Sequence, residues 1–360
     1  MHLNVANLSH FLICRGLIDA EAVVCGDLRI VDSSRRNSNF KVIRATGPGL
    51  FVKQMRQMQA DAMLTLQREA ACYELACDDP ALSRLMPRLV KYDSARHVLV
   101  VELLQEAESL GDYHIRQRTF PDDIGRMLGE ALGTCHARSS TFSENKTLEG
   151  LLARRVPVIL TLGRGGHAML GKFGTIGPPA SAILQQHEDL QALLDALGAE
   201  WRFDSLIHGD MRWDNLLVFP TQTGFDFRIV DWEMADFGDA AWDVGTVLQG
   251  FLSAWILSMP IASHLPPEAY VGVAAQPLDP MQPVLRAFWN AYAATRGIPA
   301  DKRAAELKRC MRFAAARMAW SAVEHCMFEP QLDAFATAHL QVSLNILQDP
   351  ERAVHDLLDA

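Results

Sequence analysis

The feature that most constrains this chain is a pair of acidic motifs separated by one expected hairpin. The first motif, His208 to Asn215, reads HGDMRWDN, and the second, Ile229 to Glu233, reads IVDWE. The segment between them, residues 216–230, contains two strand-like runs, LLVF and FDFRIV, on either side of a PTQTG turn. Because a hairpin brings its two ends together, we expect Asn215 and Asp231 to lie side by side.

The residue types in these motifs suit chemistry at a hydroxyl group beside a metal ion. Asn215 offers an amide oxygen and Asp231 a carboxylate, and Mg²⁺ favours oxygen ligands of this kind. A hydroxyl is a poor nucleophile, so a nearby carboxylate such as Asp210 can orient it and accept its proton late in a transfer reaction. We take Asp210 and its neighbour Arg212 as candidate catalytic residues, and Asn215 and Asp231 as candidate metal ligands.

The periodicity of the sequence predicts strands in its first third and helices beyond. After an expected helix over residues 8–23, the predicted order is three strands, one helix and a two-stranded hairpin. These segments are residues 27–32, 40–45, 50–54, 61–77, 88–93 and 97–102. After Leu104 the patterns are mostly helical, as in residues 122–139, 281–296 and 304–325.

These motifs and their order resemble those of aminoglycoside phosphotransferases and choline kinases. HGDMRWDN, IVDWE and the run Gly238 to Asp243 (GDAAWD) correspond to the catalytic-loop and metal-binding motifs of that family. The resemblance covers most of the chain. It implies an α+β, bilobal, protein kinase-like fold. The N-lobe, residues 1–104, would bind the nucleotide and hold a five-stranded antiparallel sheet plus a helix, and the mostly helical C-lobe, residues 105–360, would carry catalysis and acceptor binding.

The activity that the resemblance implies is transfer of the γ-phosphoryl group of ATP, or of GTP, to a hydroxyl group with the help of Mg²⁺. Lys53 matches the strand-three lysine that holds the nucleotide phosphates. Glu69 lies on a mostly apolar helix face, where a carboxylate needs a cation, and Lys53 is the obvious partner; Glu74 is the competing candidate. The run Glu102-Leu103-Leu104 matches the hinge, where backbone groups of Leu103 and Leu104 would bind the edge of the base.

The loop after the first expected strand departs from the usual phosphate-binding pattern. It reads SSRRNSNF and contains no glycine, although related small-molecule kinases also relax this loop. Ser33, Ser34 and Asn37 are candidate nucleotide contacts, because hydroxyl and amide groups can still hold phosphate oxygens. Arg35 and Arg36 would either add charge there or simply be solvated.

Other polar residues near the motifs admit two interpretations. His208 and Asp243 resemble residues that support the catalytic loop from behind. Glu233 would either assist at a second metal ion or face solvent. Glu233, Asp236 and Asp239 could attract a cationic acceptor, as in aminoglycoside and choline kinases, or could stabilise loops.

Composition limits the partners and the location of the protein. The 360 residues carry a net charge of −9, which argues against nucleic acid as the main partner. Seven scattered cysteines without a CxxC pair, and a start without a secretion signal, predict free thiols and a cytoplasmic protein. The uncharged run Val244 to Ala262 is too short and polar for a membrane span, so we expect a buried helix and no membrane.

Three hypotheses about the acceptor and the activity remain open at this stage. The first is a kinase of a small-molecule hydroxyl. The second is a kinase of Ser or Thr in a precursor peptide, working beside a partner biosynthetic enzyme, because the runs at 35–40 and 212–215 look similar to phosphotransferases of lanthipeptide-type biosynthesis. The third, an inactive nucleotide-binding scaffold, is disfavoured by the presence of all four central residues, which are Lys53, Asp210, Asn215 and Asp231.

Overall fold

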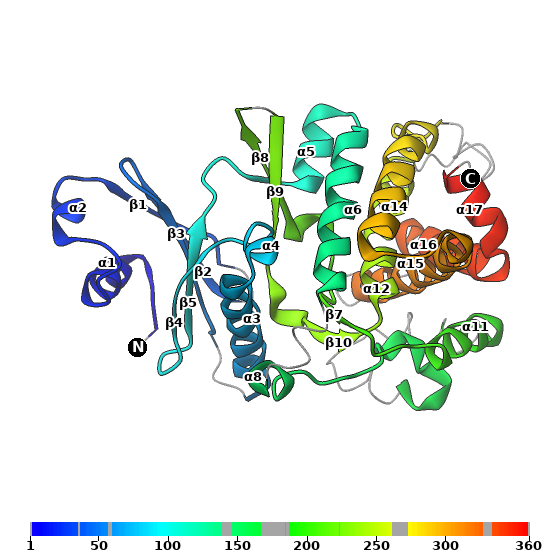
Figure 1. Cartoon of the computed structure of the whole chain (residues 1–360), viewed down its shortest axis with the longest axis horizontal. Helices are drawn as coiled ribbons and strands as arrows, with labels where there is room; N and C mark the ends of the chain where they lie inside the picture. Colours follow the sequence, from blue (N-terminus) through cyan, green and yellow to red (C-terminus); the bar gives the residue numbers. More distant parts are fainter. Residues whose placement is uncertain are drawn as a thin grey trace. The chain divides into compact units, whose positions relative to one another are not determined.

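The computed structural model describes most of the chain, namely residues 2–34, 37–56, 60–138, 146–166, 184, 187–222, 224–260, 273–326 and 333–358. Its contacts divide the chain into two units (Figure 1). The first unit comprises Met1–Tyr113, Phe142–Leu152 and Asp214–Ala235. The second comprises His114–Thr141, Ala153–Trp213 and Asp236–Ala360.

The strand-like segments of the N-terminal third form one five-stranded sheet in the first unit, as predicted. Its strands are β1 (Leu28–Asp32), β2 (Ser38–Arg44), β3 (Gly49–Gln54), β4 (Leu89–Asp93) and β5 (Val98–Leu103). Their order is β1-β2-β3-β5-β4, and every neighbouring pair is antiparallel. In this register Lys53 on β3 stands between Asn39 on β2 and Leu99 on β5, so a central strand carries it.

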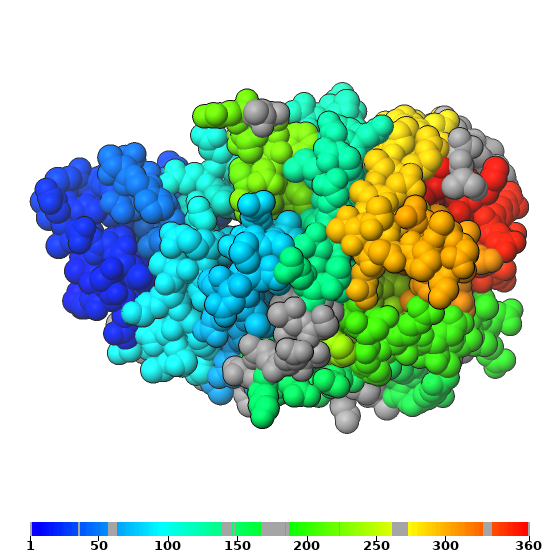
Figure 2. Space-filling view, in the orientation of Figure 1, coloured from blue at the N-terminus to red at the C-terminus, as the bar shows by residue number. Residues whose placement is uncertain are grey.

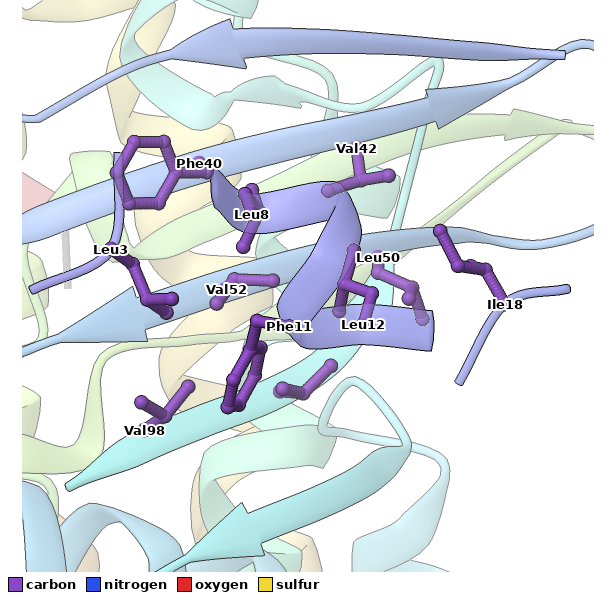
Figure 3. Packing of buried hydrophobic residues seen from close by; sticks show 11 residues of the cluster. Leu3, Leu8, Phe11, Leu12, Ile18, Phe40, Val42, Leu50, Val52 and Val98 are labelled. Atoms are coloured by element: carbon purple, nitrogen blue, oxygen red, sulfur yellow. The ribbon is translucent and has the colours of Figure 1, made fainter. Parts of the chain in front are cut away.

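An N-terminal helix covers one face of this sheet. Leu8, Phe11 and Leu12 of α1 (Val5–Cys14) point onto the apolar side chains of the strands, including Val52 (Figure 3). Leu8, Leu12 and Val52 are fully buried, which makes this packing a stabilising part of the sheet. The opposite side of α1, together with α2 (Ala20–Val24), lies at the surface of the first unit (Figure 2).

The expectation of one continuous helix over residues 8–23 is wrong, because α1 and α2 are separate. Gly16 has a φ of +65°, a left-handed conformation that glycine adopts without a steric penalty. The amide of Leu17 donates to the carbonyl of Leu12 at 3.0 Å, and the amide of Gly16 donates to the carbonyl of Ile13 at 2.9 Å. These two bonds form a Schellman ending, which terminates α1 before α2 begins.

The rest of the first unit brings the second acidic motif towards helix α3. The elements are α3 (Ala60–Asp78), α4 (Pro80–Ser83), β6 (Glu108–Ser109), α8 (Lys146–Glu149), β8 (Leu216–Thr221), β9 (Gly224–Ile229) and the 3₁₀ helix η5 (Trp232–Met234). Strands β8 and β9 form the predicted hairpin, with β6 on its edge. The strands run further than expected, since Thr221 still pairs with Gly224 inside the predicted PTQTG turn. Helix α3 packs against η5, which follows the hairpin directly.

The second unit is mostly helical. Its longer helices are α6 (Asp122–Ala137), α11 (Glu188–Ala199), α12 (Ala240–Leu257), α14 (Gln282–Arg296), α15 (Arg303–Cys326), α16 (Ala334–Gln348) and α17 (Pro350–Leu358). Shorter elements are β7 (Ser205–Ile207), β10 (Asp236–Gly238), η1 (Val158–Leu160), η2 (Leu162–Arg164), η7 (Asp279–Met281) and η8 (Ala300–Lys302). Two short elements, α5 (Leu110–Gln117) and η4 (Trp213–Asn215), each include residues of both units.

The uncharged run that begins at Val244 lies in helix α12 as far as Leu257. Helix α12 packs against α15 and α16, and most of its residues are buried. In the described part of the chain, every helix is too short or too polar to cross a bilayer. The α+β fold class, with its five-stranded antiparallel sheet and helical C-terminal part, is confirmed. The functional boundary between residues 104 and 105 stays a prediction.

Candidate active site

The centre of the candidate site in the first unit is one lysine surrounded by three carboxylates. Nζ of Lys53 lies 2.7 Å from Oε2 of Glu69, 2.5 Å from Oδ1 of Asp231 and 2.9 Å from Oε2 of Glu233. Lys53 and Glu69 are each 4% exposed, so their ion pair is shielded from water. Glu74, the competing partner, is exposed. The structure therefore pairs Lys53 with Glu69, as the apolar face of the helix indicated.

Local geometry holds the second motif in this cluster. Asp231 has a φ of +66°, a left-handed conformation that aspartate tolerates better than most residues. Trp232 is 2% exposed and fixes the turn, with its indole N–H donating to the carbonyl of Ile229 at 3.3 Å. Arg68 on α3 donates to the carbonyl of Glu233 at 3.0 Å, which ties η5 to α3.

The charges of the cluster shift the protonation of its members. Burial by itself would lower the pKa of Lys53, but the charges of Glu69, Asp231 and Glu233 outweigh it and hold that pKa well above its ordinary value. Burial raises the pKa of Glu69 to about 7, although Lys53 opposes this shift. Lys53 is therefore charged at neutral pH, and it shares its single charge among three acids.

The same carboxylates form the candidate metal site. One oxygen from each of Glu69, Asp231 and Glu233 lies within 4.8 Å of the others. Three carboxylates facing one ammonium group leave an excess of negative charge, and this donor set fits Mg²⁺, which prefers oxygen ligands. Asn215 is buried at the other end of the hairpin, and its carbonyl accepts from the amide of Val230 at 2.9 Å. The backbone thus joins the two ends of the hairpin at Asn215 and Val230, while the side-by-side position of Asn215 and Asp231 stays a prediction.

Glu233 is the member of this cluster that the sequence left undecided. Its side chain is 15% exposed, and it accepts hydrogen bonds from Lys53 and, at 3.4 Å, from the amide group of Asn37. Its position four residues after the end of β9 did not distinguish this arrangement from a surface glutamate. The packing of η5 against α3 explains why Glu233 lies beside Lys53 and not at the surface.

The loop between β1 and β2 is closed by its own hydrogen bonds. The hydroxyl groups of Ser33 and Ser34 each donate to the carbonyl of Asn39 at 3.3 Å, and the amide of Asn39 donates to Oγ of Ser34 at 3.0 Å. Asn37 is 6% exposed and faces Glu233. Of the predicted contacts in this loop, Asn37 is the one that reaches the cluster. Arg35 and Arg36 lie outside the described residues.

The predicted hinge residues lie at the end of β5. The amide of Glu102 donates to the carbonyl of Arg88 at 2.9 Å and is therefore used within the sheet. Leu103 pairs with Gly49 as the last residue of β5, and Leu104 follows the strand. The binding of a base by Leu103 and Leu104 stays a prediction.

The candidate catalytic carboxylate lies in the second unit and is contacted by two arginines. Nε and Nη2 of Arg212 lie 3.0 and 2.8 Å from Oδ2 of Asp210. Nη2 of Arg317 on α15 lies 3.6 Å from the other oxygen, Oδ1. The sequence pointed to Asp210 and Arg212 but missed Arg317, because no motif surrounds it and more than one hundred residues separate it from the loop.

A buried network supports the loop that carries Asp210. The carboxylate of Asp243 accepts from the amides of His208 at 2.7 Å and Gly209 at 3.0 Å. Nδ1 of His208 accepts from the amide of Asp210 at 3.2 Å. Nε2 of His136 donates to Asp243 at 3.2 Å. Gly209 has a φ of +80°, in the left-handed region that glycine adopts without a steric penalty because it lacks a Cβ atom.

The other acidic residues near the motifs are engaged in local structure. Both oxygens of Asp236 accept backbone amides, from Arg154 at 2.8 Å and Arg155 at 3.1 Å. The fully buried Asp239 forms a two-pronged ion pair with Arg309. These contacts favour the loop-stabilising interpretation of Asp236 and Asp239 over attraction of a cationic acceptor.

Comparison with known proteins places this geometry in a family. The sequence matches the model of the phosphotransferase enzyme family over residues 27–288. No curated protein sequence matches. The chain therefore belongs to the phosphotransferase enzyme family, which confirms the resemblance seen in its motifs. It is an enzyme that transfers a phosphoryl group to a hydroxyl.

Solved structures share the fold at low sequence identity. A choline kinase from Streptococcus pneumoniae aligns over 93% of this chain and 99% of its own, with a TM-score of 0.51 and 13% identity. A macrolide 2′-phosphotransferase from Brachybacterium faecium aligns over 96% and 99%, with a TM-score of 0.52 and 16% identity. A microcompartment-associated aminopropanol kinase aligns over 94% and 97%, with a TM-score of 0.54 and 17% identity. At these identities the likeness establishes the fold alone.

Proposed function

We propose that this enzyme uses ATP and Mg²⁺ to phosphorylate a hydroxyl group of a small molecule. The observation that carries the proposal is the buried contact of Lys53 with Glu69 and Asp231, at 2.7 and 2.5 Å. A lysine that is held by one acid, beside a second acid that can bind a metal ion, is well placed to bind the phosphates of a nucleotide. ATP is the proposed phosphoryl donor, and GTP is the alternative donor.

Each residue has a definite task in this mechanism. Lys53 would leave its contact with Asp231 to hold the phosphates, while Glu69 keeps it in place. Asn215, Asp231 and Glu233 would hold Mg²⁺, which supplies positive charge to neutralise the phosphate oxygens. Asp210 would orient the acceptor hydroxyl and accept its proton late in the transfer.

The acceptor is proposed to be a small molecule by analogy with the relatives of known structure. One of these is a choline kinase and another an aminopropanol kinase, both acting on amino alcohols by their names. Since Asp236 and Asp239 are occupied by local contacts, they add no support for a cationic acceptor. The precursor-peptide alternative, with its partner enzyme, rests on runs that include Arg35 and Arg36, and it stays a hypothesis.

A phosphate-transfer screen tests the proposal. The purified chain would be incubated with Mg²⁺ and ATP or GTP, and with aminoglycosides, amino alcohols, sugars, nucleosides and short Ser/Thr peptides. Asp210→Asn and Asp231→Ala are each expected to lower kcat at least about 100-fold, because one removes the proton acceptor and the other a metal ligand. Asp214→Asn, which changes an exposed acid in the same loop, is the control.

The outcomes separate the hypotheses. Transfer to peptides alone would replace the small-molecule proposal by the peptide kinase. Nucleotide binding without transfer to any acceptor would favour the scaffold. Near-normal activity of Asp231→Ala would show that the metal assignment is wrong.

A further inference from the structure

A buried arginine from a distant helix lies beside Asp210 and has no task in the mechanism above. Arg317 is 2% exposed, and its Cζ lies 5.3 Å from the ring centroid of Trp242. Among the described residues, Asp210 is the only acid at ion-pair distance from Arg317, with Nη2 and Oδ1 3.6 Å apart. Its Nε and Nη2 make no hydrogen bond with described residues. Because a buried charge is costly unless it is paired, Asp210 is the counter-charge that Arg317 depends on.

The other arginine on Asp210 differs in exposure and in contact. The side chain of Arg212 is 50% exposed, whereas that of Arg317 is 3% exposed. Arg212 places two nitrogens on Oδ2, at 3.0 and 2.8 Å. An exposed ion pair of this kind exchanges readily with solvent or ligand, because water compensates both charges when it opens. A buried arginine packed over a tryptophan ring has no such alternative.

We propose that the two oxygens of Asp210 have separate tasks, and that Arg317 is the positioning residue that makes this separation hold. Arg317 anchors Oδ1 and keeps the carboxylate charged and oriented throughout the reaction. Arg212 covers Oδ2 until the acceptor arrives, and the acceptor hydroxyl then takes its place on Oδ2. This inference rests on the proposed function, since it assigns a task within the same transfer reaction.

The transfer step balances with these assignments. The acceptor oxygen forms a bond to the γ-phosphorus of ATP while the bond from that phosphorus to the β,γ-bridging oxygen breaks. The hydroxyl proton moves to Oδ2 of Asp210, and ADP leaves with the electron pair of the broken bond. Arg317 forms and breaks no bond, so its removal should slow the step without changing the products.

Substitutions at Arg317 test the assignment by comparing kcat with the two KM values. In Arg317→Gln, kcat is expected to fall roughly 10- to 100-fold, because the proton acceptor loses its fixed orientation. The KM for ATP should change less than about 3-fold, since Lys53 and the metal ligands are untouched. Arg317→Lys should recover kcat to within about 5-fold of the wild type, because it returns the charge.

The control is an arginine of the same helix that faces away from Asp210. Arg312 pairs with Glu200 at 2.8 Å, so Arg312→Gln removes a charge from α15 without touching the loop. This variant should keep kcat within about 2-fold of the wild type. Binding of Mg²⁺ and ADP, measured by calorimetry, would show for every variant that it is folded.

The results either support or overturn the proposal. A folded Arg317→Gln variant with normal kcat overturns it. The proposal is also overturned if kcat falls only in those Arg317 variants that no longer bind Mg²⁺ and ADP, because Arg317 would then be purely structural. A rise in the KM for ATP with unchanged kcat also overturns it, since Arg317 would then contact the nucleotide. If the wild type transfers phosphate to no acceptor, the proposed function itself has failed. This result differs from one in which the wild type is active and the Arg317 substitution leaves kcat unchanged.

Discussion

At the scale of single residues, the candidate site depends on how one ammonium group is shared. Lys53 is the only cation within ion-pair distance of Glu69 among the described residues, and it also forms ion pairs with Asp231 and Glu233. Glu69 is buried, whereas the side chain of Asp231 is 42% exposed. The two acids therefore differ in role: Glu69 fixes the lysine, and Asp231 is accessible to a ligand.

Replacing Glu69 by Gln tests the fixing role. The lysine would then be held only by Asp231 and Glu233, so kcat/KM for ATP is expected to fall about 10- to 100-fold because Lys53 is no longer placed for the phosphates. Steady-state kinetics with varied ATP would measure this change. Glu74→Gln, on the exposed side of the same helix, should stay within about 2-fold. Equal losses in both variants would mean that α3 as a whole, and not the ion pair, is responsible.

At the scale of elements, α6 and α14 are in closer contact than ordinary side chains allow. Gly125, Gly129 and Gly133 form a stripe on α6 with a spacing of four residues, which puts them on one face of the helix. A Cβ atom built at Gly129 would collide with the carbonyl oxygen of Phe288 on α14. The stripe lets the two backbones approach, and His136 near the end of α6 contacts Tyr292 of α14 and Asp243 of α12.

Gly129→Ala is therefore expected to destabilise the fold. The added methyl group meets backbone and not a flexible side chain, so α14 must shift, at a cost of about 1–3 kcal/mol. Urea unfolding followed by circular dichroism would measure the loss. The control is Glu130→Ala at the exposed neighbouring position, whose effect should stay below about 0.5 kcal/mol. A Gly129→Ala protein as stable as the wild type would contradict the close approach.

At the scale of the whole molecule, folding and ligand binding are linked. Lys53 on β3 and the proposed metal ligands Asp231 and Glu233 after β9 are far apart in sequence and meet only in the folded chain, so a metal–nucleotide complex held by both binds the folded chain only. Such a ligand stabilises the fold by mass action, by about 2.7 kcal/mol at one hundred times its Kd.

Mg²⁺ with ADP should accordingly raise the melting temperature by roughly 3–6 °C. EDTA should remove the metal-dependent part of this shift, and Asp231→Ala should show little of it. Differential scanning fluorimetry at a series of Mg²⁺ concentrations would measure both effects. Asp226→Asn, on β9 of the same hairpin, is the control and should respond like the wild type. The metal assignment fails if Asp231→Ala retains the full shift.

Local patterns predicted those parts of the protein that depend on neighbouring residues in the sequence. The alternation of β1 to β5 and the periodicity of α3 predicted the five-stranded sheet and its helix, and the strand-like runs between the acidic motifs predicted the hairpin of β8 and β9. The break at Gly16 was missed because a helical pattern continues on both sides of it, and only the backbone conformation separates α1 from α2.

By itself the sequence determined the family and the strands of the N-terminal sheet, and it predicted Lys53, Glu69, Asp210, Asn215 and Asp231 as site residues, because short motifs and periodic patterns encode them. Only the tertiary structure decided which charges meet. Glu233 pairs with Lys53 because η5 packs on α3. Asp239 pairs with Arg309, and Arg317 of α15 lies at ion-pair distance from Asp210. These pairings join residues far apart in the chain, and the burial that makes them strong exists only once the helices have packed.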